Sequence, residues 1–516
     1  MSRYSGSVNR FSLTVAGLAG AVSAFGFDPY GWWPLTLLCL VVLLRLLQDA
    51  LTLRRALGLG YWFGVGHFTV GLNWIAGAFA YQEAMPVWLG WVAVVSLALY
   101  IAVYPAMAAG LAWRWRRGPL SAAFLFGAAW AVTEWLRATI FTGFAWNPLS
   151  VAMVDTGLAQ TAQWTGTYAL SGLVALGAGL ILAVLYREGR PLAIAGLSGL
   201  ALLWLAGDWD RSVPARGIGK PILARIVQPN IGQQDKYAPG YDAINFAKLA
   251  ALTGRPSARP RLILWPEAAI PDYLDEGTVD AREARNRIAA LLGPYDILLT
   301  GGVKRHFRIE EHEFYLERRL IGARNNVWGM DRQGRLLFRY DKAHLVPYGE
   351  YLPLKPVLSA FGLSRLVPGD IDFWPGPGPQ SYRAPGFGRI GIQICYEIIF
   401  SGQVLDPDSR PDFLFNPSND AWFGPWGPPQ HLAQARLRAI EEGMPVVRST
   451  PTGISAVIDA DGRILASLPY RKAGYLERQV PSADDPTLFS RLGNILLFAA
   501  ALLLAAIGVA LRQKQR

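Results

Sequence analysis

Residues 391–397 read Gly391-Ile392-Gln393-Ile394-Cys395-Tyr396-Glu397 and place a cysteine directly after an apolar, strand-like segment. The chain has one other cysteine, Cys39, which lies inside a long apolar stretch, so Cys395 has no disulfide partner. A lone thiol at the end of a buried strand, with an acid two residues further on, fits a nucleophile better than a packing residue. The rest of the sequence must then supply a base and a cation.

The chain around this segment is unusually apolar. Hydrophobic residues make up 52% of its 516 residues and charged residues only 17%, which is too apolar for an ordinary soluble enzyme. The long apolar stretches lie before Asp208 and after Asn494. We therefore predict a membrane domain over residues 1–210, a polar domain over 211–487, and a membrane helix with a basic tail over 488–516.

Eight segments have the length and composition of membrane-spanning helices. They are Phe11–Phe27, Trp32–Leu47, Leu57–Phe79, Val87–Trp113, Ala122–Phe141, Tyr168–Leu185, Leu192–Ala206 and Asn494–Leu511. No convincing cleavage site follows the first segment, so we interpret it as a retained anchor and not as a signal peptide. Glu134, inside the fifth segment, is either a functional acid or the partner of Arg137, and we favour the pair.

Basic residues predict the orientation of these spans. They occupy alternate loops and both ends of the chain: Arg3, Arg10, Arg45, Arg54, Arg55, Arg114, Arg116, Arg117, Arg187, Arg190, Arg512, Lys514 and Arg516. With eight spans, both termini and every basic loop lie in the cytoplasm, and the polar domain lies outside. Topology explains much of the net charge of +11. No RNA- or DNA-binding motif accompanies this charge, so we expect no nucleic-acid partner.

The polar domain mixes strand-like and helix-like segments. Continuously apolar runs, typical of sheets covered on both faces, are Ile222–Val227, Leu262–Leu264, Ile297–Thr300, Asn326–Met330, Leu336–Tyr340, Ile390–Ile394, Phe413–Phe415 and Ile454–Ile458. Helical patterns fit Tyr241–Leu252, Val279–Leu292 and His431–Glu442. Asp461-Gly462 predicts a hairpin turn. We predict an α/β fold of two packed sheets with helices outside.

Three of these strands end at residues that together suit acyl chemistry. A thiol such as Cys395 needs a base and electrostatic support to attack a carbonyl. The Glu267 carboxylate can take its proton, and the Lys342 ammonium can stabilise the thiolate and then an oxyanion. Taken singly, each residue also fits a structural role, as a cap, a solvated lysine or a small buried side chain. No histidine is required, and His344 and His431 are the nearest alternatives for proton transfer.

The motifs around these residues resemble the Glu–Lys–Cys signatures of the nitrilase superfamily. They are Trp265-Pro266-Glu267, Asp341-Lys342-Ala343-His344-Leu345-Val346-Pro347-Tyr348-Gly349-Glu350, Cys395-Tyr396-Glu397 and Asn419-Asp420-Ala421-Trp422-Phe423-Gly424. Flanked by membrane spans, such a domain is similar to the membrane-embedded branch of that superfamily, the bacterial apolipoprotein N-acyltransferases. The resemblance covers nearly the whole chain and implies a nitrilase-like αββα sandwich for the polar domain.

The resemblance also assigns roles to individual residues. It implies Glu267 as general base, Lys342 as stabiliser of thiolate and oxyanion, and Cys395 as nucleophile. Glu350 matches a second glutamate that orients the lysine or helps proton transfer. Tyr396 and Glu397 match residues that shape the pocket, and the backbone N–H of Tyr396 is a second oxyanion donor.

Four aromatic residues are candidates for a lid or for contact with the acyl chain. Tyr237 stands where the family often has tryptophan, and an aromatic side chain is kept there. Phe361 lies in the Pro- and Gly-rich segment Val346–Pro379, which is either a lid against the bilayer or local core. Trp422 and Trp426 either line an acyl tunnel or lie at the membrane interface.

The resemblance implies a two-step acyl transfer. Cys395 takes the sn-1 acyl chain of a phospholipid, typically phosphatidylethanolamine, as a thioester, and the α-amino group of an S-diacylglyceryl-cysteine apolipoprotein then receives it. Both substrates lie in the outer leaflet of the inner membrane. We expect no metal and no other cofactor, since the sequence has no metal-ligand cluster or phosphate-binding glycine loop. The alternatives are a membrane-tethered amidase that uses water, and a transporter or scaffold with a degenerate nitrilase domain.

Overall fold

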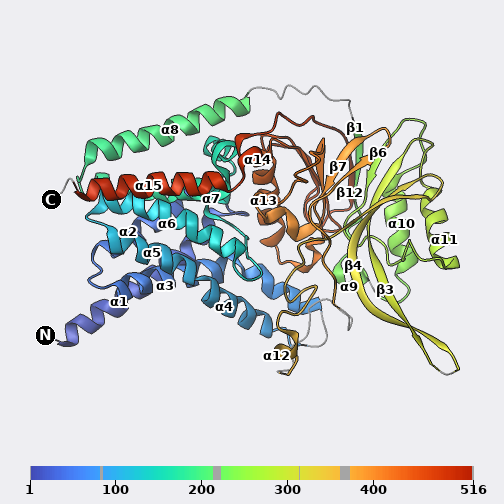
Figure 1. Ribbon diagram of the computed structural model, residues 1–516, viewed down its shortest axis with the longest axis horizontal. Coiled ribbons are helices and arrows are strands. Elements are labelled where there is room, and N and C mark those ends of the chain that lie inside the picture. Colours follow the sequence, from blue (N-terminus) through green and yellow to red (C-terminus); the bar gives the residue numbers. More distant parts are fainter. Residues whose placement is uncertain are drawn as a thin grey trace.

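The computed structural model describes residues 2–81, 85–212, 222–236, 238–312, 314–360 and 372–513. A helical part forms one end of the molecule and two β-sheets form the other (Figure 1). The start of α1 (Ser2–Ser23) and the end of α15 (Ile495–Gln513) both lie at the helical end, far from the sheets (Figure 1). The chain therefore enters and leaves the helical part on the same side.

The helical part is built mainly from the segments that the sequence predicts as spans. Besides α1 and α15, its helices are α2 (Trp33–Gln48), α3 (Leu53–Gly71), α4 (Leu89–Ile101), α5 (Val103–Trp115), α6 (Pro119–Thr139), α7 (Ala162–Leu185) and α8 (Arg190–Ser212). By length and composition, three helical stretches of the described chain can cross a membrane: Leu89–Trp115, Gly157–Leu185 and Arg190–Ser212. Shorter apolar helices are Arg10–Gly26, Trp33–Gln48 and Ile495–Leu511.

The two longest predicted spans differ in shape from a single straight helix. The segment predicted as Leu57–Phe79 is α3 up to Gly71, followed by the 3₁₀ segment η2 (Asn73–Tyr81). The segment predicted as Val87–Trp113 is α4 and α5 with only Ala102 between them. The number of spans remains a prediction at this point.

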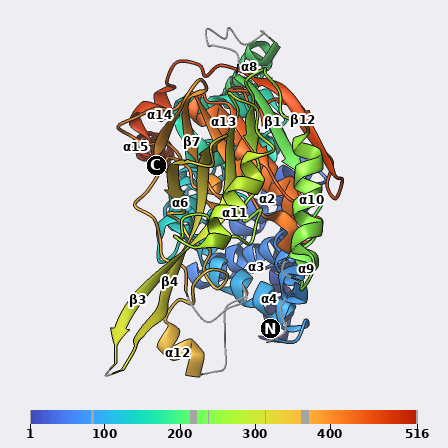
Figure 2. The same cartoon turned by 90° about the vertical axis from the view of Figure 1, so that its right-hand side faces the viewer.

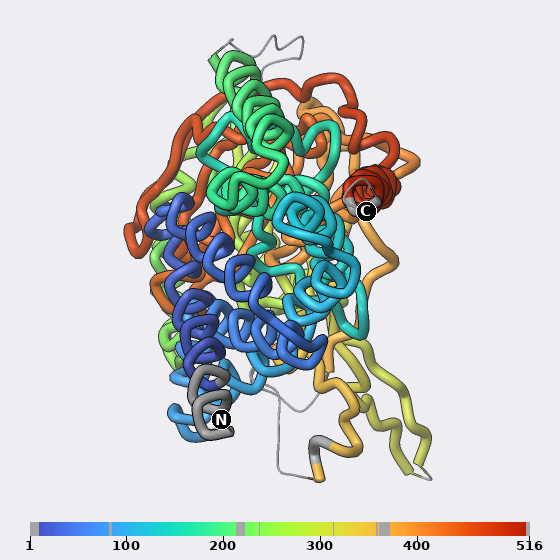
Figure 3. Tube along the Cα trace, turned by 90° about the vertical axis from the view of Figure 1, so that its left-hand side faces the viewer, coloured from blue at the N-terminus to red at the C-terminus, as the bar shows by residue number. Residues whose placement is uncertain are grey.

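Small residues allow these helices to pack backbone against backbone. A Cβ atom on Gly127 of α6 would lie 2.8 Å from the carbonyl oxygen of Gly172 of α7, and the reverse holds for Gly172. Between α1 and α3, a Cβ atom on Gly66 would lie 2.0 Å from the Gly17 carbonyl oxygen. Such contacts are typical of helices that associate in membranes. Figure 3 shows α8, by contrast, at the edge of this part, where most of its surface is uncovered.

The polar domain contains two six-stranded sheets. One has the order β12-β1-β2-β3-β4-β5 and the other the order β11-β10-β9-β8-β7-β6. The strands are β1 (Ile222–Gln228), β2 (Leu262–Leu264), β3 (Ile297–Glu311), β4 (Leu316–Asp331), β5 (Leu336–Asp341), β6 (Ser381–Ala384), β7 (Gly388–Ile392), β8 (Phe413–Pro417), β9 (Val446–Ser449), β10 (Ala456–Ile458), β11 (Ile464–Ser467) and β12 (Gly474–Val480).

Alternate residues of the central strands face opposite layers, because side chains alternate along a strand. Ile226 of β1 and Phe415 of β8 belong to the core between the sheets. Val227 packs instead with α10 (Asp242–Thr253) and α11 (Val279–Ala289), and Leu414 packs with α13 (Gly427–Glu442). Figure 2 shows α10 and α11 over the outer face of the first sheet. The polar domain is thus the αββα sandwich that the sequence predicts.

The sheets also extend beyond the predicted strands. β3 and β4 are 15 and 16 residues long, and their outer halves form a ribbon that projects from the sandwich (Figure 2). This ribbon is polar and exposed, so it carries no apolar run. The edge strands β6 and β12 were missed for the same reason. The predicted hairpin at Asp461-Gly462 is confirmed, since β10 and β11 pair on either side of it.

Helix α13 lies between the second sheet and the helical part (Figure 1). It begins with prolines in its first turn and ends at Gly443, whose φ of +59° suits glycine. Its Gln430 side chain accepts a hydrogen bond from Trp146 Nε1 (2.8 Å) and donates to the carbonyl oxygens of Asp28 and Gly71 (3.1 and 3.3 Å). One helix therefore ties the sandwich to several loops of the helical part.

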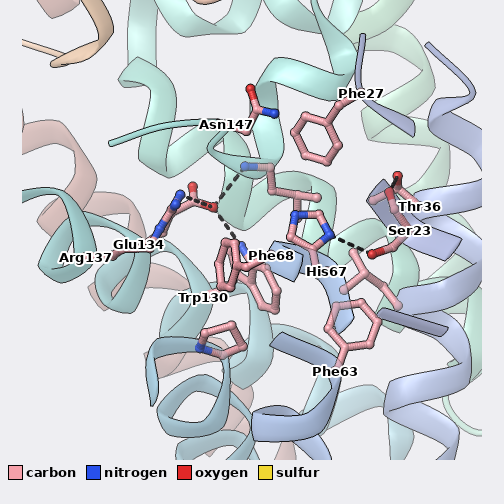
Figure 4. Close-up of a pocket in the computed structure, with 13 residues that line it drawn as sticks. Ser23, Phe27, Thr36, Phe63, His67, Phe68, Trp130, Glu134, Arg137 and Asn147 are labelled. Atoms are coloured by element: carbon pink, nitrogen blue, oxygen red, sulfur yellow. Dashed lines mark hydrogen bonds and ion pairs between the residues drawn. The ribbon is translucent and has the colours of Figure 1, made fainter. Parts of the chain in front are cut away.

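Glu134 and Arg137 form the buried pair that the sequence favours. Arg137 Nη2 lies 3.8 Å from Glu134 Oε1, and Arg137 Nη1 donates to the Trp146 carbonyl oxygen at 2.8 Å. Figure 4 shows both residues beside a small cavity, with His67 across from them bonded to Ser23. The charged pair therefore holds the loop after α6 in the position where Trp146 reaches α13.

A second buried pair at the other end of α13 predicts a measurable loss of stability. Glu441 accepts hydrogen bonds from Thr167 N (2.5 Å) and Ser401 Oγ (2.7 Å), and its Oε2 lies 2.9 Å from Arg438 Nη1. Glu441→Gln leaves the buried Arg438 charge without its partner, which costs about 3–5 kcal/mol. We expect a clear fall in the thermal unfolding temperature of the detergent-solubilised protein.

The matched control is Asp49→Asn, which removes the exposed pair between Arg45 and Asp49. Exposed pairs contribute at most about 1 kcal/mol, so this variant should unfold close to the wild-type temperature. Equal effects of the two substitutions would contradict a bridging role for Glu441.

Candidate active site

Three strand ends bring the predicted catalytic side chains together. Glu267 follows β2, Lys342 follows β5, and Cys395 follows β7. Their exposed fractions are 7%, 1% and 6%. Because β2 and β5 belong to one sheet and β7 to the other, the cluster is assembled between the two sheets.

Lys342 is held by two carboxylates and shares them with an asparagine. Its Nζ donates to Glu350 Oε1 at 2.9 Å and lies 3.5 Å from Glu267 Oε1. Asn325 Nδ2 donates to the same two oxygens, at 2.7 Å to Glu267 and 2.9 Å to Glu350. One ammonium and one amide thus keep two buried acids side by side. Asn325, from β4, was not predicted, because a lone asparagine within a strand gives no sequence signal.

Cys395 begins the 3₁₀ turn η5 (Cys395–Ile399) with a φ of +51°. This conformation is strained for a residue with a side chain and is common at functional sites. The Cys395 carbonyl oxygen accepts hydrogen bonds from His431 Nε2 (3.0 Å) and Asn416 Nδ2 (3.5 Å). These two side chains support the turn that presents the thiol.

Glu397 links the turn that carries Cys395 to the turn that carries Lys342. Its Oε1 accepts from Tyr340 Oη (2.8 Å) and from the backbone N–H groups of Ala343 (2.6 Å) and His344 (3.1 Å). Its Oε2 accepts from the backbone N–H of Ile394 (2.6 Å). Burial raises the pKa of Glu397 to about 7, and these donors oppose the rise. The predicted pocket-shaping acid is therefore a clamp between the two sheets.

A buried charged group lies under the Cys395 turn. Arg448 Nη2 donates to Asp420 Oδ2 at 2.6 Å and lies 3.0 Å from His431 Nδ1. Burial and the Arg448 charge lower the pKa of His431, and its Nδ1 also lies 3.0 Å from Asp420 Oδ1. Its Nε2 carries a proton that it donates to the Cys395 carbonyl oxygen, because a carbonyl oxygen can only accept. His431 therefore supports the turn through the Cys395 carbonyl oxygen.

The other histidine weighed as an alternative also has a structural place. His344 stacks on Phe400 with ring centroids 3.7 Å apart, and its Nε2 lies 3.2 Å from the Thr142 carbonyl oxygen. Neither contact involves the thiol of Cys395. The Glu267 carboxylate therefore stays the predicted acceptor of the thiol proton.

Electrostatics keep the resting thiol protonated. Burial, reinforced by the Glu267 charge, raises the pKa of Cys395 well above its usual value, while Lys342 lowers it. Burial opposes the charge of Lys342, but Glu350 and Glu267 outweigh it and raise the pKa of Lys342. The cluster thus pairs a neutral thiol with a permanent cation and an acceptor for its proton.

The predicted aromatic residues lie in different surroundings. Tyr396 is buried and its Oη donates to the Gly143 carbonyl oxygen at 3.4 Å, so it packs against the loop after α6. Trp422 faces Tyr81, and Trp426 packs edge-on against Phe25. Both tryptophans therefore contact the helical part. The predicted lid residues Tyr237 and Phe361 lie outside the described residues.

The C-terminal end of the Val346–Pro379 segment lies against the site. The backbone N–H of Phe373 donates to the Glu350 carbonyl oxygen (3.1 Å), and that of Gly376 donates to the Lys342 carbonyl oxygen (2.7 Å). This end of the segment is consequently part of the support of the two residues.

One group near the thiol has the residue types of a metal site. Cys395, Asp420 and His431 place ligand atoms within 4.8 Å of one another. However, the Arg448 guanidinium lies inside this group and is hydrogen bonded to Asp420. A cation there opposes the binding of another, so these residues do not fit a divalent metal.

Two protein-family models match the chain. The carbon–nitrogen hydrolase model matches residues 223–484, which include both sheets and the buried cluster. The model of the apolipoprotein N-acyltransferase N-terminal domain matches residues 19–180 of the helical part. The sandwich with its buried glutamate, lysine and cysteine is therefore a carbon–nitrogen hydrolase domain joined to a helical domain.

Two relatives match this chain over nearly its whole length and theirs. The apolipoprotein N-acyltransferase of Rhodopseudomonas palustris is 33% identical over 96% of this chain and 93% of its own. That of Caulobacter vibrioides is 35% identical over 96% of this chain and 94% of its own. A carbon–nitrogen hydrolase structure from Helicobacter pylori covers 50% of this chain and 89% of its own, with 15% identity and a TM-score of 0.32. The chain belongs to the apolipoprotein N-acyltransferase family. This membership and the apolar helices of the chain indicate a membrane protein.

The charges around Cys395 predict opposite effects of two substitutions on its reactivity. Only the thiolate is alkylated, so the raised pKa means that the iodoacetamide rate should climb about tenfold per pH unit through neutral pH and beyond. Glu267→Gln removes a charge that raises the pKa of Cys395 and should speed alkylation at pH 7. Lys342→Met removes a charge that lowers it and should slow alkylation. All measurements use a Cys39→Ala background, and effects of the same sign would contradict this electrostatic picture.

The two hydrogen bonds of Asn325 predict a specific loss of turnover. In Asn325→Ala the two carboxylates lose their shared amide, so Glu267 and Lys342 shift relative to the thiol. A displacement of about 1 Å can cost roughly 100-fold in rate, and we expect such a fall in kcat with little change in KM. Asn286→Ala, on the exposed face of α11, is the control. A raised KM with an unchanged kcat would instead show that Asn325 acts in substrate binding.

Proposed function

We propose that the protein transfers the sn-1 acyl chain of a phospholipid to the α-amino group of S-diacylglyceryl-cysteine apolipoproteins, by a ping-pong mechanism through a thioester on Cys395. The observation that carries this proposal is the place of the thiol. Cys395 lies with a carboxylate and an ammonium in a hydrolase-type domain that is docked, through α13, on a membrane domain of the apolipoprotein N-acyltransferase family.

In the first half-reaction Glu267 takes the thiol proton and Sγ of Cys395 attacks the ester carbonyl carbon. The Lys342 ammonium, with the Tyr396 backbone N–H as a second donor, stabilises the oxyanion. The ester C–O bond then breaks, and Glu267 returns the proton to the alcohol oxygen of the lysophospholipid. Glu350 holds Lys342 in place through the 2.9 Å hydrogen bond.

In the second half-reaction the neutral α-amino group of the diacylated cysteine attacks the thioester carbon. Glu267 takes a proton from this nitrogen and delivers it to Sγ as the C–S bond breaks. An amide and a free thiol result. Water competes with the amine, so an entrance filled by lipid favours transfer over hydrolysis.

The proposal includes a placement in the inner membrane. Eight spans put both termini in the cytoplasm and the catalytic domain, residues 211–487, in the periplasm, between a membrane domain of residues 1–210 and a closing helix within 488–516. This placement is supported by the basic residues in alternate loops. It is also supported by the start of α1 and the end of α15, which both lie at the end of the molecule opposite the sheets (Figure 1). Both lipid substrates then reach the site from the outer leaflet, with phosphatidylethanolamine as the proposed donor.

The covalent intermediate gives a direct test. Incubation with phospholipid labelled in the sn-1 chain should label the protein through a hydroxylamine-sensitive bond, and a diacylated lipopeptide should then remove the label as triacylated product. Cys395→Ala should abolish both signals, whereas Cys39→Ala should leave them near wild-type. Release of free fatty acid without triacylated product would instead identify a hydrolase that uses water.

A further inference from the structure

Glu267 lines a narrow pocket that Cys395 and Lys342 do not line. The pocket is also bordered by Lys236, Asn245, Asp242 and Pro271. It has about 20 Å³ of room for the centres of water molecules, which is enough for one water molecule and far too little for a lipid. Asp242 and Pro271 are exposed, whereas Glu267 is buried. The pocket thus leads from the proposed base towards solvent.

Two residues that border this pocket carry buried oxygen atoms that can accept a hydrogen bond from water. Glu267 Oε2 and Asn245 Oδ1 are buried and, among the described residues, have no hydrogen-bond partner. Asn245 is fixed in place, since its Nδ2 donates to the Asp235 carbonyl oxygen at 2.9 Å. Lys236 Nζ donates to the backbone carbonyl oxygen of Glu267 at 3.3 Å. A water molecule in the pocket therefore has a carboxylate and an amide among the acceptors that border it.

The proposed reaction leaves one proton to dispose of in each cycle. In the first half-reaction the thiol proton passes through Glu267 to the lysophospholipid, so none is left over. The acceptor amine, however, has an ordinary pKa of about 8 and is mostly an ammonium at neutral pH. It must lose one proton before its nitrogen can attack and a second one as the amide forms. Only the second returns to Sγ of Cys395, so the first has to leave the site.

We propose that the pocket bordered by Lys236 and Asn245 is the route by which Glu267 passes this surplus proton to water. This inference rests on the proposed ping-pong function. The proposed lipid-filled entrance offers no water, whereas the pocket is bordered both by Glu267 and by the exposed residues Asp242 and Pro271. Asn245 is a positioning residue for the water, and Lys236 is a positioning residue whose charge favours the ionised carboxylate and so drives the proton outward.

The electrostatics of Lys236 agree with this role. Burial lowers its pKa to about 8, while the charges of Glu267 and Cys395 oppose the fall. Asp242 is the further charged group that borders the pocket. Lys236 is therefore cationic at neutral pH, when the acceptor arrives as an ammonium, and its charge declines as the acceptor becomes neutral.

Separate measurement of the two half-reactions tests the proposal. Acyl-enzyme is first formed from labelled phospholipid and then mixed with a diacylated lipopeptide, between pH 6 and pH 9. Lys236→Met and Asn245→Leu should slow consumption of the thioester by about tenfold or more at pH 6.5 and leave its formation within about twofold. The deficit should shrink towards pH 9, where the amine binds without its surplus proton. Lys236→Arg should stay near wild-type.

Lys248→Met, on α10 but outside the pocket, is the matched control and should change neither step. The proposal is overturned if Lys236→Met and Asn245→Leu slow both half-reactions equally, if neither step changes, or if the deficit is the same at every pH. If the wild-type protein forms no thioester at all, the proposed function fails independently of this inference.

Discussion

The Glu397 carboxylate is the contact on which the catalytic arrangement depends. Lys342 and Cys395 come from different sheets, and apolar packing between sheets fixes their distance less sharply than hydrogen bonds do. Glu397 accepts from Tyr340 and from the backbone after β5 with one oxygen, and from the backbone before Cys395 with the other. A single buried acid thereby converts two strand ends into one rigid unit.

Charges in this unit balance in pairs. Glu267 and Glu350 flank Lys342, with Lys236 behind Glu267, and Asp420 faces Arg448 under the thiol. Burial of an unpaired charge is costly, so each acid in the site is accompanied by a cation or by several donors. Cys395 is buried among these groups as a neutral thiol, because burial raises its pKa. The energetic cost of building the site is thus met before substrate arrives, and the reactive group is the one whose proton can move.

The sequence predicts much of this fold because several strands are continuously apolar and end at characteristic polar residues. The β2, β5 and β7 segments could be placed for that reason, and with them Glu267, Lys342 and Cys395. The outer halves of β3 and β4 and the edge strand β12 face solvent, so their residues carry no such pattern. The roles of Asn325 and Arg448 could not be predicted either, because the role of a polar residue inside a strand depends on the side chains that folding brings next to it. Single apolar segments could not reveal the break between α3 and η2 either.

Helix α13 serves both parts of the protein at once. One side of it supports the Cys395 turn through His431, and Gln430 and Glu441 reach the loops and helices of the membrane domain. On that side the catalytic sandwich is consequently covered by the membrane domain and not by solvent. Unlike a free-standing amidase, it cannot be cut out as a soluble enzyme without uncovering Phe423, Trp426 and the charged residues of α13. The outer layer of the catalytic sandwich on that side is therefore at the same time an internal wall of the whole protein.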